Sequence, residues 1–180
     1  MRLKKEDCFA VVVDFQEKLM PVIDRQDEVL RRAEILVQGL QALEVPVIVT
    51  RQYPKGLGDT AMPLRDTLGD APVLDKMTFS IMGEPDIQGA IEKIGRKTAI
   101  VCGVETHICV LQSVIDLQAA GYQTVLVSDA VSSRQPADRQ VGIDRAMQEG
   151  SLITSVESLL FELTERAGGD VFKTISKLIK

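Results

Sequence analysis

A chain of 180 residues, of which 45% are hydrophobic and 26% charged, is expected to form one globular domain over residues 1–180. Its formal net charge of −5 argues against a nucleic-acid partner, which would require a basic surface. No apolar stretch reaches the ~20 residues of a membrane-spanning helix, and the N-terminal one, broken at Asp14, is too short for a signal peptide. Three cysteines do not make a disulfide framework, so we expect a cytoplasmic protein with reduced thiols and no membrane partner.

Short apolar runs alternate with helical patterns in the first half of the chain. The run Cys8–Val13 is typical of a strand that is buried on both faces. Apolar residues spaced three and four apart follow Asp27 and trace one helical face, and Pro85 and Gly95 are typical start and stop residues of a later helix. In order, we predict a strand at 8–13, a helix at 27–43, a strand at 47–49 ended by the polar stretch 50–58, a strand at 71–74 and a helix at 85–95.

The same alternation continues in the second half. Thr106 is a candidate cap for a helix that Gly121 ends, and the apolar spacing after position 170 predicts a short amphipathic helix. In order, we predict a strand at 98–102, a helix at 106–120, a strand at 124–127, a helix at 136–148, a short strand near 152, and helices at 156–166 and 171–179. This order predicts a three-layer α/β/α sandwich with a mostly parallel, Rossmann-like sheet covered by helices on both faces.

Cys109 is the residue of greatest chemical interest, because it places a lone thiol in the first turn of a predicted helix, directly after a strand. The free N–H groups and the dipole of a helix N-terminus favour thiolate over thiol. Ligands of open parallel sheets bind at the carboxyl ends of the strands. We therefore expect an activated Cys109, although a buried cysteine can also act as a small apolar residue.

A carboxylate and an ammonium group are predicted to lie near this thiol. Asp14 ends the first strand and Lys76 follows the strand at 71–74, and strand ends of a parallel sheet meet at one edge. Lys76 would favour the thiolate, while Asp14 would accept the thiol proton and later activate water. Taken singly, Asp14 could instead cap backbone N–H groups, and Lys76 could be a solvated side chain beside Asp75.

Other kinds of site are disfavoured. His107, the single histidine, lies two residues from Cys109 and would point to nearly the opposite side of a helix, which argues against Cys-His catalysis. Cys8 and Cys102 fall in predicted strands, which leaves too few ligands for zinc, and we expect neither a metal nor a cofactor. Residues 56–61 (GLGDTA) match a glycine-rich dinucleotide pattern but do not lie tightly between a strand and a helix.

The chain resembles the isochorismatase-like cysteine hydrolases, and most closely their isochorismatase domain-containing subgroup of unassigned substrate. The matching segments span almost the whole chain in the expected order. They are 11–16 (VVVDFQ), 52–58 (QYPKGLG), 76–80 (KMTFS), 103–109 (GVETHIC) and 129–133 (DAVSS).

The resemblance implies a six-stranded parallel sheet between helices and a catalytic triad that falls on Asp14, Lys76 and Cys109. It also implies a cis peptide bond without proline between Val104 and Glu105. The turn there would aim the backbone N–H groups of Glu105 and Cys109 at one point and form an oxyanion hole. A homo-oligomer, a dimer or larger, is implied as well.

Two departures restrict the expected reaction. Nicotinamidases of this family bind a metal through an aspartate and histidines near the second strand, where this chain has Arg51, Gln52 and Tyr53. The enzyme that hydrolyses the vinyl ether of isochorismate does not use a cysteine nucleophile. The sequence therefore favours a metal-independent hydrolase of a small-molecule substrate with an amide or related C–N bond.

The expected pocket walls are Gln16, Tyr53 and Phe79, which neighbour the triad or the loop that faces it. Two alternatives of other classes stay open. One is a catalytically inactive binding or scaffold protein that keeps the fold. The other is a thiol redox sensor based on Cys109, which would need a resolving partner although Cys102 is predicted to lie in a strand.

Overall fold

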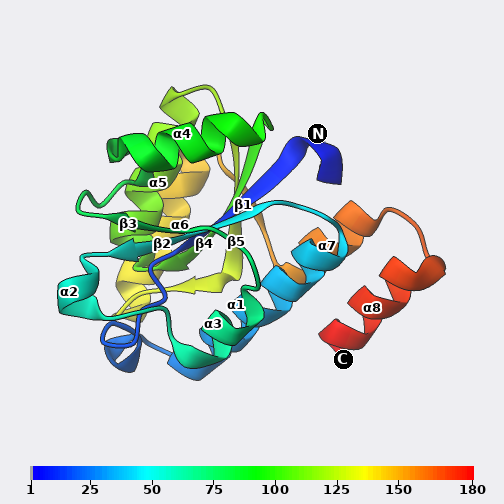
Figure 1. Cartoon of the computed structure of the whole chain (residues 1–180), viewed down its shortest axis with the longest axis horizontal. Helices are drawn as coiled ribbons and strands as arrows, with labels where there is room; N and C mark the ends of the chain where they lie inside the picture. The colour runs from blue at the N-terminus through cyan, green and yellow to red at the C-terminus, as the bar shows by residue number, and fades with distance from the viewer. Residues whose placement is uncertain (1) are drawn as a thin grey trace.

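The computed structural model describes residues 2–180 and contains a sheet of six strands in the order β3-β2-β1-β4-β5-β6 (Figure 1). All neighbouring strands of this sheet pair in parallel. The strands are β1 (Cys8–Val13), β2 (Val47–Gln52), β3 (Val73–Lys76), β4 (Thr98–Val104), β5 (Gln123–Ser132) and β6 (Leu152–Thr154). The predicted α/β class with a parallel, Rossmann-like sheet is confirmed.

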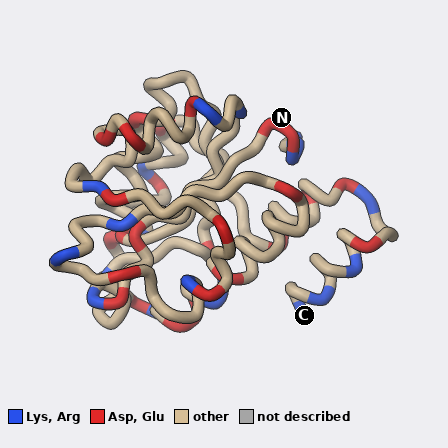
Figure 2. Tube along the Cα trace, in the orientation of Figure 1, with Lys and Arg blue, Asp and Glu red and all other residues tan. Residues whose placement is uncertain are grey.

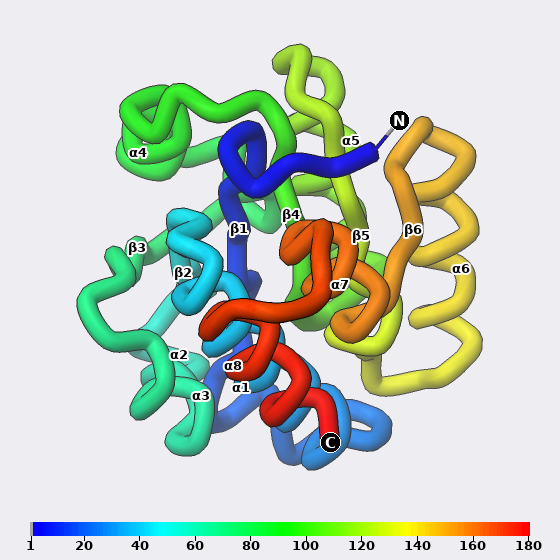
Figure 3. Tube along the Cα trace, turned by 90° about the vertical axis from the view of Figure 1, so that its right-hand side faces the viewer, coloured from blue at the N-terminus to red at the C-terminus, as the bar shows by residue number. Residues whose placement is uncertain are grey.

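Helices cover both faces of the sheet and complete the three predicted layers (Figure 1 and Figure 3). The core on one face is built with side chains from α1, α3, α7 and α8, and the core on the other face with side chains from α4, α5 and α6. The helices are α1 (Gln26–Ala42), α2 (Pro54–Leu57), α3 (Met62–Thr67), α4 (Pro85–Ile94), α5 (Leu111–Ala119), α6 (Pro136–Gln148), α7 (Val156–Thr164) and α8 (Gly169–Ile179). The single turns are η1 (Lys5–Asp7), η2 (Met20–Val22), η3 (Ile81–Gly83) and η4 (Thr106–Val110).

Strand β1 shows why the central strands are continuously apolar. Successive side chains of a strand point to opposite faces, and both faces of this sheet are covered. Every side chain of β1 is therefore buried, alternating between the two cores. Polar chemistry can enter such a strand only where it ends, and Asp14 is the first residue after β1.

Strand β2 differs from its prediction, and the difference matters for the site. The polar residues from Thr50 onward were expected to begin a loop, but β2 continues to Gln52. Thr50 and Gln52 pair with Leu74 and Lys76 of β3, and their side-chain polar groups find hydrogen-bond partners inside the fold. Strand β5 is also longer than predicted and runs to Ser132. The expectation that these polar residues end their strands was wrong, because partners distant in sequence satisfy them.

Most charged side chains lie on the helices and loops that surround the sheet. Figure 2 shows acidic and basic positions interspersed along the outer elements, whereas the central strands carry almost none. Within residues 2–180, no helix combines the length and the apolar character that crossing a membrane requires.

Candidate active site

The structure brings Asp14, Lys76 and Cys109 together at the carboxyl edge of the sheet. Asp14 follows β1, Lys76 is the last residue of β3, and Cys109 lies in η4, just after β4. The Lys76 Nζ lies 2.7 Å from Asp14 Oδ2, and both side chains are 0% exposed. Cys109 is 6% exposed, and Asp14 and Lys76 are the two charged groups that act on the pKa of its thiol. The buried ion pair and the buried thiol therefore belong to one cluster.

Asp14 is held by the neighbouring strand β2. Its backbone adopts a left-handed conformation (φ 57°), which aspartate tolerates better than most residues. Thr50 accepts a hydrogen bond from the Asp14 N–H through its carbonyl, and its hydroxyl donates to Asp14 Oδ1 at 2.8 Å. With Thr50 on one carboxylate oxygen and Lys76 on the other, the Asp14 carboxylate does not cap backbone N–H groups.

Lys76 is enclosed by acceptors. Besides Asp14, its Nζ donates to Gln52 Oε1 at 2.7 Å, to the Phe79 carbonyl at 3.0 Å and to the Thr78 carbonyl at 3.2 Å. The solvated alternative does not hold, since the Lys76 side chain has no exposed surface.

The structure does not support the expectation that Cys109 rests as a thiolate because it lies near a helix N-terminus. The pKa of the Cys109 thiol is raised to about 12, chiefly by burial; the Asp14 carboxylate adds to the rise and the Lys76 ammonium acts against it. The loss of hydration is therefore the largest cause. A pKa in this range contradicts the expected resting thiolate and favours the protonated thiol.

The turn that carries Cys109 has an unusual backbone. The peptide bond between Val104 and Glu105 is cis, as the resemblance implied, and η4 is a π-helical turn that leads into α5. The Glu105 carboxylate accepts hydrogen bonds from Arg134, from its N–H at 2.9 Å and its Nε at 3.1 Å. Thr106 does not cap the helix as predicted, and its buried hydroxyl has no partner within residues 2–180.

The three expected pocket residues have different surroundings. Gln16 is fully buried. Its Nε2 donates to the carbonyls of Gln52 and Gly58, both at 2.9 Å, and its Oε1 accepts from the Gln52 N–H at 2.7 Å. Gln16 therefore joins the end of β2 to the loop that follows it, through its bonds to Gln52 and Gly58. Tyr53 and Phe79 are 47% and 53% exposed, so their rings are accessible to a ligand.

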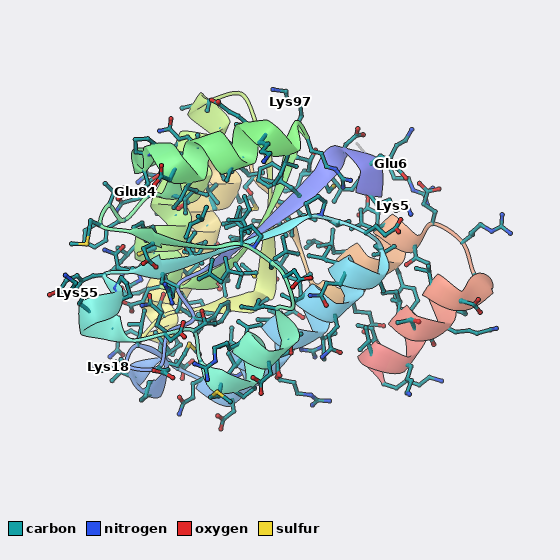
Figure 4. All side chains as sticks on the ribbon, in the orientation of Figure 1. Lys5, Glu6, Lys18, Lys55, Glu84 and Lys97 are labelled. Atoms are coloured by element: carbon teal, nitrogen blue, oxygen red, sulfur yellow. The ribbon has the colours of Figure 1, made fainter. Side chains whose placement is uncertain are left out.

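A cavity of about 330 Å³ opens beside Lys76. Its lining includes Tyr53, Met77, Lys55 and Glu84, and Figure 4 shows Lys55 and Glu84 on the same side of the molecule. Neither Asp14 nor Cys109 is among the lining residues.

His107 is directed away from the triad. Its Nδ1 lies 2.9 Å from Ser133 Oγ, and its Nε2 lies 3.9 Å from Asp138 Oδ2. Across residues 2–180, no three His, Cys, Asp or Glu side chains are grouped in a way that could hold a metal ion.

Sequence reasoning missed four side chains that support the triad. Two are Thr50 and Gln52, which could have been found by continuing the two-residue alternation of β2 past position 49. Ser113 donates to the Cys109 carbonyl at 2.6 Å and accepts from the Ile81 N–H at 3.1 Å, which joins the loop after β3 to the turn that carries Cys109. The fourth is Glu84, which holds that same loop.

Glu84 accepts hydrogen bonds from the N–H groups of Met77 and Thr78, at 2.8 and 2.9 Å, and from the Thr78 hydroxyl at 3.0 Å. The two backbone N–H groups hold the pKa of the Glu84 carboxyl below its ordinary value. These bonds fix the short loop whose carbonyls contact Lys76. A single sequence carries no local signal for this role.

Solved structures of other proteins share this fold. The MAR1 ribonuclease of Caenorhabditis elegans is 34% identical and superposes with a TM-score of 0.93, covering 99% of this chain and 92% of that one. The YcaC protein of Escherichia coli, described as an octameric hydrolase of unknown specificity, is 23% identical with a TM-score of 0.93, covering 99% of this chain and 89% of its own. At that identity, YcaC supports the fold alone.

Sequence relatives give the family. The secreted isochorismatase effector Isc1 of Phytophthora sojae is 40% identical over 184 residues, which cover 99% of this chain and 87% of the relative. Isochorismatase domain-containing protein 2A of Mus musculus is 34% identical over 180 residues, covering 99% and 85%. The isochorismatase domain profile matches residues 8–158, which include Asp14, Lys76 and Cys109. The chain therefore belongs to the isochorismatase family and has its hydrolase fold.

Proposed function

We propose that the protein is a metal-independent hydrolase of a small amide or a related C–N bond, with Cys109 as its nucleophile. The observation that carries this proposal is the buried Asp14–Lys76 ion pair, 2.7 Å across, whose two charges both act on the pKa of the Cys109 thiol. A base, a fixed cation and a nucleophile in a site that excludes water are what covalent catalysis at a carbonyl requires.

In the proposed reaction, Asp14 accepts the thiol proton as the sulfur attacks the carbonyl carbon. The C=O electron pair moves to oxygen, where the backbone N–H groups of Glu105 and Cys109 would stabilise it. The oxyanion collapses, the C–N bond breaks, and Asp14 returns the proton to the leaving amine. Asp14 then takes a proton from water, whose oxygen attacks the thioester, and the carboxylic acid leaves as Cys109 regains its proton.

The other residues have supporting parts in this proposal. Lys76 keeps the negative charge of Asp14 stable in a buried site. Tyr53 and Phe79 form walls for the substrate, whereas Gln16 acts through the loop that it braces. We further propose a homo-oligomer, a dimer or larger, for which the octameric YcaC is a precedent in fold. A cytoplasmic location remains our expectation from the cysteines, although the Phytophthora relative is named as secreted.

The test is covalent trapping followed by turnover. The protein is incubated with a library of small amides, and peptide mass spectrometry locates any acyl adduct. We expect the adduct on Cys109, and we expect Cys109→Ser to lower turnover at least ~10³-fold. The control variant Cys102→Ala should keep turnover within about twofold of wild type, because Cys102 lies in the core away from the ion pair.

Other outcomes point to the alternatives. Hydrolysis that survives Cys109→Ser contradicts the proposed nucleophile. Absence of adduct and hydrolysis across the library favours a binding or scaffold protein, and reversible peroxide oxidation confined to Cys109 favours a redox sensor. RNA enters the same assay, because the C. elegans neighbour is named a ribonuclease. RNA cleavage without amide hydrolysis would overturn the proposed substrate class.

The pH dependence of Cys109 alkylation tests the protonation state. Because the pKa of the Cys109 thiol is about 12, its alkylation by iodoacetamide should be slow at pH 8 and should keep accelerating toward pH 12. The Asp14 charge raises the pKa of the Cys109 thiol, so Asp14→Asn should lower that pKa and speed alkylation at pH 8. The same variant should lose hydrolysis, because it has no base at position 14. The rate is measured for each cysteine by mass spectrometry. A wild-type profile with a midpoint below ~8.5 would show a resting thiolate and contradict this assignment.

A further inference from the structure

The Lys76 ammonium group donates three hydrogen bonds, to Gln52, Thr78 and Phe79, and has Asp14 as its ion-pair partner. Its Nζ carries three hydrogens, and four oxygens surround it, on Asp14, Gln52, Thr78 and Phe79. No proton is left for a substrate or for the developing oxyanion. In this arrangement Lys76 contributes a positive charge at a constant place.

Gln52 is the only neutral side chain in this acceptor set, since the other two neutral acceptors are backbone carbonyls. Strand β2 lies between the strands that carry Asp14 and Lys76, and Gln52 pairs directly with Lys76 in the register. Two residues earlier on the same face of β2, Thr50 donates to Asp14. One strand therefore contacts both members of the ion pair.

The amide of Gln52 can take only one orientation. Its Nε2 donates to the Met77 carbonyl at 2.9 Å, while its Oε1 accepts from Lys76 at 2.7 Å. Exchanging the two atoms would set an NH₂ group against an ammonium and an oxygen against a carbonyl. The backbone of Gln52 is fixed in turn by the side chain of Gln16, which bonds both its N–H and its carbonyl.

We infer that Gln52 is a positioning residue that holds Lys76 as an immobile cation beside Asp14 and Cys109. If the proposed hydrolysis takes place, on which this further step depends, Lys76 supplies only positive charge and Asp14 alone transfers protons. The fixed position of Lys76 follows from its hydrogen bonds and can be tested without any substrate.

The test observes the ammonium group directly by ¹⁵N NMR in the full-length protein. A buried, fully bonded ammonium exchanges its hydrogens slowly with water and gives its own resonance, which Lys76→Arg identifies by removing it. Gln52→Met has a similar size but no acceptor, and we expect hydrogen exchange at least tenfold faster or loss of the resonance. Gln52→Glu keeps an acceptor oxygen and should keep the slow exchange, although it gives up the bond to Met77. If Gln52→Met does not fold, Gln52→Ser replaces it.

The control is Gln41→Met, which makes the same chemical change in a glutamine that binds the carbonyls of Thr67 and Leu68. It should leave the Lys76 resonance unchanged. Unaltered exchange in Gln52→Met overturns the inference, as does a wild-type protein without a protected Lys76 resonance. Equal loss in Gln52→Met and Gln52→Glu also overturns it, because the bond to Met77 would then be the cause.

Turnover provides the second readout. Once a substrate is known, Gln52→Met should lower kcat at least tenfold and change KM less than about twofold, since Gln52 acts through Lys76. If no amide is hydrolysed while the NMR result stands, only the proposed function fails. If hydrolysis is found and Gln52→Met leaves both kcat and the resonance unchanged, only the positioning role fails.

Discussion

Replacing Lys76 with methionine is expected to lower the free energy of unfolding by about 3–5 kcal/mol, because it leaves a buried carboxylate without its counter-ion. Lys76 Nζ and Asp14 Oδ2 are 2.7 Å apart with no exposed side-chain surface, so water cannot replace the missing charge. Methionine is unbranched and similar in length to lysine, so it removes the charge with little change in side-chain volume. Urea denaturation monitored by circular dichroism gives the change.

A double-mutant cycle separates the free energy lost with the ion pair from the free-energy cost of burying an unpaired charge. Asparagine at position 14 is neutral and tolerates the left-handed backbone that Asp14 adopts. The double variant Asp14→Asn/Lys76→Met buries no unpaired charge. Its destabilisation should fall short of the sum of the two single variants by at least about 2 kcal/mol. Additive effects would show that the two charges do not interact.

A surface ion pair provides the matched control. Arg145 in α6 and Glu149, the residue directly after α6, are separated by 2.9 Å, but the Arg145 side chain is 54% exposed. Arg145→Met should change the free energy of unfolding by no more than about 0.5 kcal/mol. A loss as large as that of Lys76→Met would mean that burial is not what makes the Asp14–Lys76 pair important.

Gly103→Ala is expected to destabilise the protein by about 3–5 kcal/mol, the sum of backbone strain and overpacking. Gly103 has a φ of 146°, which an L-residue with a side chain rarely adopts. A methyl group there would lie 2.4 Å from the Val13 carbonyl oxygen and 2.6 Å from its Cβ. The obstruction is the backbone of β1 directly before Asp14, so relieving it displaces a triad residue.

Thermal and urea unfolding measure this effect, and hydrolysis should fall with it. Gly89→Ala is the control, since Gly89 lies in α4 with ordinary backbone angles and has no atom within 4 Å of the added methyl group. Because alanine favours a helix more than glycine does, Gly89→Ala should stabilise the protein by about 0.5–1 kcal/mol. A fully stable Gly103→Ala variant would contradict the close approach of β4 to β1.

The strands and helices that carry the site could be predicted from sequence because their signals are local. The apolar run that β1 forms ends at a carboxylate, and residues 103–110 combine a strand end, a turn and a thiol. Both patterns follow from the rule that a strand covered on two faces is polar only at its ends. The predicted bounds of β1 and α6 agree with the structure, and the close contact of Asp14, Lys76 and Cys109 agrees with parallel strand ends meeting at one edge.

The role of β2 could not be read in the same way. Thr50 and Gln52 look like the start of a loop, because an isolated polar stretch after three apolar residues is typical of one. In the fold, Thr50 bonds a carboxylate 36 positions earlier and Gln52 an ammonium 24 positions later. Their strand geometry depends on partners that only folding brings close.

The sequence by itself determined the α/β class, the parallel sheet and the three chemical groups that converge at its edge, since these depend on local pattern and on the general geometry of strands. The tertiary structure alone decided the raised pKa of the Cys109 thiol and the set of acceptors around Lys76. Both depend on burial and on groups that approach from other strands. A pKa near 12 for the Cys109 thiol reflects lost hydration and the Asp14 charge, neither of which is a property of the residues adjacent in the chain.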